Sequence, residues 1–151
     1  MGADHGGWVL NRLRSLQRPL NPYLAISVGG ALGANARYLL ASWATAQWGT
    51  QFPVGTVLIN VSGSLILGVY ITLATERFTG FPALRLLVTT GFLGAFTTFS
   101  TFSLEAVQLI GSGDAAAGIG YIVANVALSV VAAAIGMRVA HTLVSHSSGG
   151  L

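Results

Sequence analysis

The chain has 151 residues, of which 53% are hydrophobic and only 7% are charged. An ordinary soluble domain is about 25% charged, so this chain has too few charged side chains to cover a soluble surface. A disordered chain would need low hydrophobicity. The composition therefore excludes a soluble enzyme domain and a disordered segment, and it predicts a membrane protein. Cysteine is absent, which removes disulfides, thiolate nucleophiles and cysteine-based metal sites.

The N-terminal segment, residues 1–22, carries three arginines and two prolines: Arg12, Arg14, Arg18, Pro19 and Pro22. It has no apolar core of the kind that a cleavable signal peptide needs. We expect a tail or a short amphipathic helix beside the membrane. The arginines of the chain form no continuous basic run that could follow a phosphate backbone, so we do not expect nucleic-acid binding.

Charged residues divide the rest of the chain into four long apolar stretches. A helix that spans a bilayer needs about 20 mostly apolar residues. We therefore expect an all-α membrane protein with four transmembrane helices and a short C-terminal tail at 143–151. The expected helices are at about 23–46, 54–75, 84–111 and 115–142, and together they leave no room for a soluble domain.

The first two expected helices carry small residues four apart, including Gly29 with Gly33. Such pairs let helices approach closely in lipid. Asn60 is the only amide in the second helix, and a polar group inside a bilayer faces either a partner or a water-filled path. Its amide could donate to an anion or form a structural bond between helices. Arg37 is either a charge that attracts anions or an anchor that reaches the interface.

The third expected helix contains the most informative segment, residues 91–103, in which more than half of the residues are Gly, Thr or Ser. Two glycines followed by paired threonines predict a break at mid-membrane. Backbone that leaves the helix there must be buried in protein or line a cavity, and its free carbonyls could bind a hard cation such as Na⁺. A packing seam whose hydroxyls bond to their own helix is the alternative.

Aromatic and polar side chains repeat along the third and fourth expected helices. Phe99 and Phe102 share a helix face, and their positive ring edges could stabilise an anion, although such a pair can equally face lipid or the core. Glu105 continues this face. The fourth helix has a stripe with a spacing of four residues, which is either a track of donors or a polar seam: Tyr121, Asn125 and Ser129.

Catalysis is not expected, because the sequence lacks the usual catalytic groupings. His5, His141 and His146 lie in the tails or at a helix end, so they form neither a metal cluster nor a catalytic pair. No nucleophile-elbow motif of the Gly-x-Ser-x-Gly type occurs. We expect a protein that is not an enzyme.

Three segments together resemble the Fluc (CrcB) family of bacterial fluoride channels over about residues 24–140. They are Gly29–Tyr38, Gly55–Gly68 with Asn60, and Gly91–Phe102. The resemblance implies a fluoride-specific channel in the cell membrane (the inner membrane of a bacterium), where passive efflux reduces fluoride toxicity. It also implies an antiparallel, dual-topology dimer with two fluoride pathways.

The resemblance further implies roles for particular residues. A structural Na⁺ would lie at the dimer centre, held by the main-chain carbonyls of Gly94 and Thr97. Asn60, Phe99 and Phe102 would line the pore, with Ser100 and Thr101 close to it. A polar track and vestibule would include Arg37, Glu105, Tyr121, Asn125 and Ser129. The fourth-helix match rests on spacing alone, and family members often have Ser where Asn125 stands.

The distribution of arginine disagrees with a dual-topology homodimer. Four spans put both termini and the second loop on one side, and six arginines lie there or at the adjoining helix ends: Arg12, Arg14, Arg18, Arg77, Arg85 and Arg138. The positive-inside rule then favours cytoplasmic termini, whereas a dual-topology chain should show little bias. We favour the homodimer, and pairing with an oppositely oriented paralogue is the alternative.

Two other functions compete with a fluoride channel. A small dual-topology multidrug exporter also has four helices, but it needs a carboxylate within the membrane to exchange protons for a cation. The first expected helix has no acid, and Glu105 lies late in the third. A subunit that assembles without conducting is the remaining possibility, and it would leave the polar break without a purpose.

Overall fold

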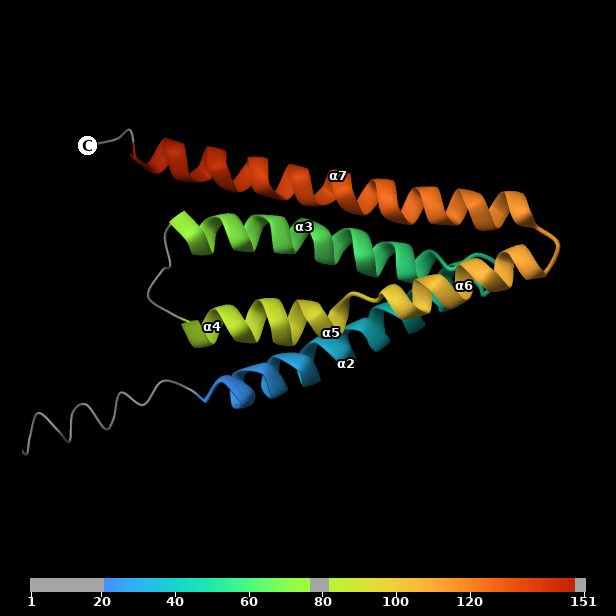
Figure 1. The fold of residues 1–151 in the computed structure, drawn as a ribbon, viewed down its shortest axis with the longest axis horizontal. Coiled ribbons are helices and arrows are strands. Elements are labelled where there is room, and N and C mark those ends of the chain that lie inside the picture. Colours follow the sequence, from blue (N-terminus) through green and yellow to red (C-terminus); the bar gives the residue numbers. More distant parts are fainter. Residues whose placement is uncertain (1–20, 77–81, 149–151) are drawn as a thin grey trace, which may run out of the picture.

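The computed structural model describes residues 21–76 and 82–148. Within these ranges the secondary structure is entirely helical, and Figure 1 shows the helices running roughly alongside one another. The elements are α2 (Pro22–Trp48), α3 (Val54–Glu76), α4 (Pro82–Leu86), the π-helical segment η1 (Leu87–Leu93), α5 (Gly94–Phe96), α6 (Phe99–Gly111) and α7 (Ala115–Ser148).

Four spans in the described residues are long and apolar enough to cross a membrane: Pro22–Trp48, Val54–Glu76, Pro82–Gly111 and Ala115–His146. The expected all-helical, four-span fold is therefore confirmed. The expected end of the last helix at 142 was too early, because α7 continues to Ser148. Residues 143–148 are thus part of this helix, whereas residues 1–20, with their arginines, and Arg77 lie outside the described residues.

Local sequence signals explain where the helices begin and end. Asn21 caps α2 by accepting a hydrogen bond from the amide of Tyr23 at 3.0 Å, and Pro22 suits the first helical turn because its missing N–H has no partner there. Asp114 caps α7 in the same way, accepting from the amide of Ala117 at 2.9 Å. The turn before it uses Gly113 at φ 94°, a conformation that favours glycine.

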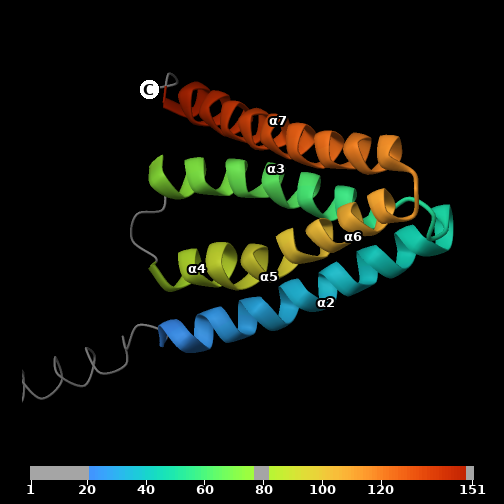
Figure 2. The ribbon, with the colours of Figure 1, turned by 45° about the vertical axis from the view of Figure 1, so that its right-hand side comes forward.

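The third span is broken, as the sequence predicts. Thr97 and Thr98 are extended, with ψ angles of 155° and 118°, and they separate α5 from α6. Thr98 also caps α6, because its hydroxyl oxygen accepts a hydrogen bond from the amide of Thr101 at 3.2 Å. Figures 1 and 2 both show α6 leaving the line of α4 and α5 at this point.

The break lets the third span change its neighbours. Its first half, η1 and α5, packs against α2, whereas its second half, α6, packs against α7. The pair α3 and α7 forms the other long helix contact and lies side by side in both views (Figures 1 and 2). The third span therefore bridges α2 and the α3–α7 pair.

Glycines make the two main helix contacts possible. A Cβ atom at Gly33 would collide with the main-chain carbonyl of Phe92, and one at Gly29 with the carbonyl of Leu87. Between α3 and α7, a Cβ at Gly68 or Gly136 would likewise meet backbone of the facing helix. Lipid is as apolar as the side chains, so close packing of this kind drives helix association in membranes.

Gly33→Ala should destabilise the contact between α2 and η1 by about 1–3 kcal/mol, because a backbone carbonyl cannot move aside as a side chain would. Gly30→Ala is the matched control, since a Cβ at Gly30 meets nothing within 4 Å. Thermal unfolding of the purified protein in detergent should show a lower midpoint for Gly33→Ala alone. Equal midpoints for the two variants would contradict this packing.

Candidate functional site

A cleft of about 380 Å³ lies beside the helix break, between α3, the third span and α7. Its walls include Asn60 from α3, Thr98, Phe99 and Phe102 from the third span, and Asn125 and Ser129 from α7. None of the described residues that line it is charged. The structure therefore brings together most of the residues that the sequence singles out, on an uncharged surface.

Asn60 holds the broken backbone in place. Its Oδ1 accepts from the amide of Thr98 at 2.9 Å, and its Nδ2 donates to the carbonyl of Thr98 at 3.1 Å. The same Nδ2 donates to Oδ1 of Asn125 at 3.0 Å. Of the two interpretations left open by the sequence, the geometry supports the structural bond between helices.

At the break, the main-chain carbonyls of Gly94 and Thr97 lose the amide donors that a continuous helix would give them. In a continuous α-helix the amides of residues 98 and 101 would bond to these carbonyls. Here the amide of Thr98 donates to Asn60, and the amide of Thr101 donates to the hydroxyl of Thr98. Main-chain oxygens of this kind are hard, neutral ligands of the sort that Na⁺ accepts.

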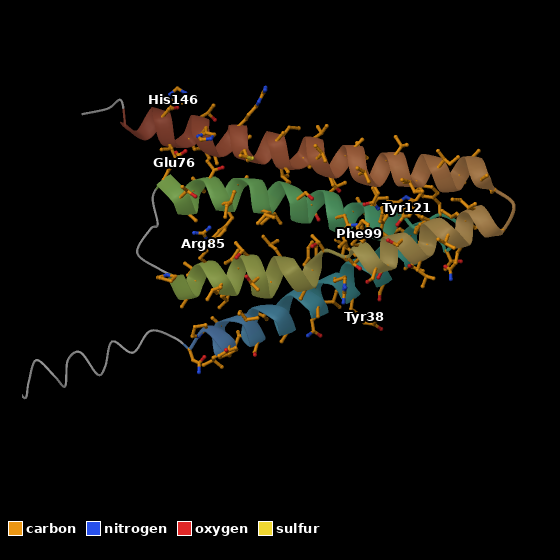
Figure 3. The ribbon with its side chains drawn as sticks, in the orientation of Figure 1. Tyr38, Glu76, Arg85, Phe99, Tyr121 and His146 are labelled. Atoms are coloured by element: carbon orange, nitrogen blue, oxygen red, sulfur yellow. The ribbon has the colours of Figure 1, made fainter. Side chains whose placement is uncertain are left out.

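The two phenylalanines contact each other with their ring centroids 5.5 Å apart and their planes tilted by 53°. Phe102 is 7% exposed and also packs on Tyr121, whereas Phe99 is 78% exposed in the single chain. Figure 3 shows Phe99 where α6 begins, beside the break. Both rings line the cleft, so a small ion in the cleft could reach them.

Glu105 lies on α6, one turn after Phe102, and its carboxylate accepts hydrogen bonds from two hydroxyls. Thr56 donates to its Oε1 at 3.0 Å, and Tyr121 donates to its Oε2 at 2.6 Å. Glu105 also lines a second, polar cleft of about 280 Å³ near the loop between α2 and α3, together with Gln51 and Gln108. Glu105 and Tyr121 thus form a polar cluster separate from the first cleft, whose described lining includes neither of them.

Thr56 is a site residue that the sequence analysis missed. It is 5% exposed and donates to Glu105. It precedes Asn60 by four residues, so both lie on one face of α3. That spacing is the sequence signal that could have found it.

Besides Glu105 and Tyr121, three expected site residues do not line the first cleft. Ser100 and Thr101 are exposed on α6, and Thr101 is engaged with the hydroxyl of Thr98 at 3.0 Å. Arg37 lies on α2, lines neither cleft, and pairs with no acid among the described residues. Both interpretations of Arg37, a charge that attracts anions and an anchor that reaches the interface, stay predictions.

Comparison with known proteins matches this architecture to one family. The family model described as "CrcB-like protein, Camphor Resistance (CrcB)" matches residues 24–137. A protein of Rhizobium etli named fluoride-specific ion channel FluC is 46% identical over 121 residues, covering 80% of this chain and 97% of the relative. Proteins with the same name from Roseiflexus sp. and Hahella chejuensis are 45% and 44% identical, covering 80% and 77% of this chain and 97% and 92% of the relatives. With most of its length matched, including the broken third span, the chain belongs to the CrcB family.

Proposed function

We propose that this chain forms a fluoride-specific ion channel, which is not an enzyme, and that it lets fluoride leave the cell passively and so reduces fluoride toxicity. The multi-pass fold and the family, with its relatives named as fluoride channels, support a channel function. The observation that carries the proposal is the uncharged cleft beside the helix break, lined by amide, hydroxyl and aromatic groups. The membrane is the cell (inner) membrane.

The chemistry of this cleft suits a small, strongly hydrated anion. Such an ion must exchange its water for hydrogen-bond donors, and conduction requires binding that is weak enough to release it. Amide and hydroxyl donors and ring edges supply partial positive charge without a formal one. An arginine or lysine in the same place would hold the anion more tightly.

The exporter alternative receives no support from the geometry of Glu105. A proton-coupled exporter needs a carboxylate that is free to exchange a proton for a cation. Both carboxylate oxygens of Glu105 accept hydrogen bonds, from Thr56 and Tyr121. The other acid on the same side of the break, Asp114, caps α7 at the helix end.

Replacing both Phe99 and Phe102 by Ile should reduce fluoride efflux by at least tenfold, because aliphatic side chains lack the positive edge of an aromatic ring. The measurement is fluoride efflux from liposomes that contain the purified protein, followed with a fluoride electrode. Phe92→Ile is the control, since Phe92 stacks on Phe96 and does not line the cleft. Undiminished efflux from the double variant would refute the pore role of the two rings.

We propose that two antiparallel copies pair around a structural Na⁺, bound by the carbonyls of Gly94 and Thr97 from each copy. Gly94 is exposed in the single chain, and both carbonyls have lost their helical donors, as described above. The donor set of neutral main-chain oxygens fits Na⁺ rather than a softer metal. The ion would join the two breaks, and lipid would surround the remaining apolar surface.

Removing Na⁺ should weaken the proposed dimer and lower fluoride efflux, because the freed carbonyls would then face one another without a cation. The test is to replace Na⁺ with N-methyl-D-glucamine during purification and assay, and to measure the dimer fraction and the efflux. An experimental structure should show an ion about 2.3–2.6 Å from the carbonyls. Unchanged dimer and efflux without Na⁺ would overturn the assignment.

The orientation of the copies is a separate proposal. Arg85 lies at the end of the molecule that also holds Glu76 and His146 (Figure 3), and Arg138 lies in the half of α7 nearest that end. This asymmetry of charge argues for a single orientation. We nevertheless propose a homodimer, because both copies of one chain can supply the same break and the same carbonyls.

If the homodimer forms, this chain expressed alone should insert both ways, and its C-terminus should be found on both sides of the membrane. Paired reporters fused after residue 151, one active only in the cytoplasm and one active only outside, measure the two populations. A variant with Arg85→Ala and Arg138→Ala should move the ratio towards equality. A single orientation, with efflux only when an oppositely oriented paralogue is present, would establish the heterodimer.

A further inference from the structure

Four aromatic rings form a row that leads from the first cleft to the loop between α2 and α3. Phe99 contacts Phe102, and Phe102 contacts Tyr121, in both cases with ring centroids 5.5 Å apart. Phe52 from the loop completes the row, with its ring centroid 5.6 Å from that of Tyr121. Phe52 lines neither cleft. The row nevertheless connects it to residues that do.

Two phenylalanines fix the ring of Tyr121, which Figure 3 shows in the half of the molecule where α6 and α7 pack together. The ring of Phe102 is tilted by 43° to it, and the ring of Phe52 is perpendicular to it. Perpendicular rings attract because the positive edge of one meets the negative face of the other. Tyr121 is 0% exposed, so its ring has no contact with solvent. Phe52 therefore helps to set the direction in which the hydroxyl of Tyr121 points.

The loop holds Phe52 in a defined position. Gly49 turns the chain after α2 at φ 75°, a conformation that favours glycine. The carbonyl of Phe52 accepts a hydrogen bond from the amide of Val54 at 2.8 Å, which closes a three-residue turn. The middle residue of this turn is Pro53, whose ring fixes its own φ angle. Phe52 thus stands directly before α3 on a backbone with little freedom.

The hydroxyl of Tyr121 is one of two donors that hold the carboxylate of Glu105. Tyr121 donates to Oε2 at 2.6 Å, and Thr56 donates to Oε1 at 3.0 Å. The shorter distance is typical of a charge-assisted hydrogen bond. Because each carboxylate oxygen has its own partner, the loss of either donor would let the carboxylate rotate.

The direction of this carboxylate matters to a passing anion. Glu105 lines the second cleft and comes one turn after Phe102, which lines the first. Like charges repel, and they do so more strongly where water is scarce. A carboxylate held at both oxygens keeps its negative charge in one place, whereas a loosely held one could turn towards the anion and repel it.

We propose that Phe52 is a positioning residue of the channel, which acts through the ring of Tyr121 to keep the carboxylate of Glu105 in a direction that lets the anion pass. Phe52 itself does not touch the ion. The proposal rests on the proposed channel function and adds to it a residue of the α2–α3 loop. The aromatic contact of Phe52, rather than its apolar bulk, carries this role.

Phe52→Leu removes the aromatic contact and keeps an apolar side chain. Fluoride efflux from liposomes should fall about threefold or more, the effect of losing one aromatic pair. Phe52→Met should keep more efflux than Phe52→Leu, because the two side chains are close in volume but the methionine sulfur is attracted to an aromatic ring. Trp48→Leu is the matched control, since it removes a perpendicular ring contact with Trp43 at the same end of α2 and lines neither cleft.

Tyr121→Phe distinguishes positioning from a general loosening of the fold. This change removes the hydroxyl and keeps the ring, so the hydrogen bond to Glu105 is lost whatever stands at position 52. If Phe52 acts through that hydroxyl, Phe52→Leu should lower efflux much less in the Tyr121→Phe background than in wild type. Equal fold-losses in the two backgrounds, as independent sites give, would overturn the positioning role.

Infrared spectroscopy gives a readout that does not depend on conduction. The C–O stretching band of Tyr121, identified as the band missing from Tyr121→Phe, reports whether its hydroxyl donates. The band should shift in Phe52→Leu and stay in place in Trp48→Leu. Phe52 is 38% exposed, so we expect Phe52→Leu to fold, and its thermal unfolding in detergent checks this; Phe52→Ile replaces it if it does not. An unshifted band in the folded variant would overturn the proposal even if efflux fell.

The outcomes distinguish this proposal from the channel function itself. If wild type gives no fluoride efflux, the proposed function fails, and the infrared band still shows whether Phe52 orients Tyr121. If wild type conducts and Phe52→Leu conducts equally well, only the positioning role is overturned. A loss of efflux in Trp48→Leu as large as that in Phe52→Leu would overturn it too.

Discussion

The hydrogen bonds between Asn60 and the main chain of Thr98 are the interaction on which the site depends. At membrane depth no water is available to an exposed amide or carbonyl, and each unsatisfied group costs several kcal/mol. Asn60 offers one acceptor and one donor to the extended backbone at 2.9 and 3.1 Å. It thus takes the place of a helical partner and makes a break in the third span tolerable in lipid.

The break in turn organises the rest of the molecule. Because the chain leaves helical geometry at Thr97 and Thr98, the first half of the third span can pack on α2 while α6 packs on α7. The cleft lies beside the break, and the glycine contacts between α3 and α7 hold two of the helices that line it close together. By stabilising the break, the side-chain amide of Asn60 therefore supports the packing of the third span, the cleft and the loss of helical donors at two carbonyls.

Much of the fold was predictable because its causes are local. Four spans follow from the length and hydropathy of the stretches between charges, and the break follows from glycines and paired threonines in residues 91–103. The packing role of Gly33 was also predictable, since small residues four apart serve close helix contacts in lipid. The end of α7 was not, because residues 143–148 continue a helix with no breaking residue to mark its end.

The site, like the fold, has one part that was predictable from the sequence and one part that was not. The sequence by itself determined that the protein is an all-helical membrane protein with a polar break and which donors are available near it, since these depend on composition and on spacing within one helix. Only the tertiary structure decided how the donors are used. Asn60 meets Thr98 and Asn125 across separations of 38 and 65 residues, and no spacing within one helix could have predicted these pairings. Spacing along a helix shows which side chains share a face, but only the packing of the helices determines what that face meets.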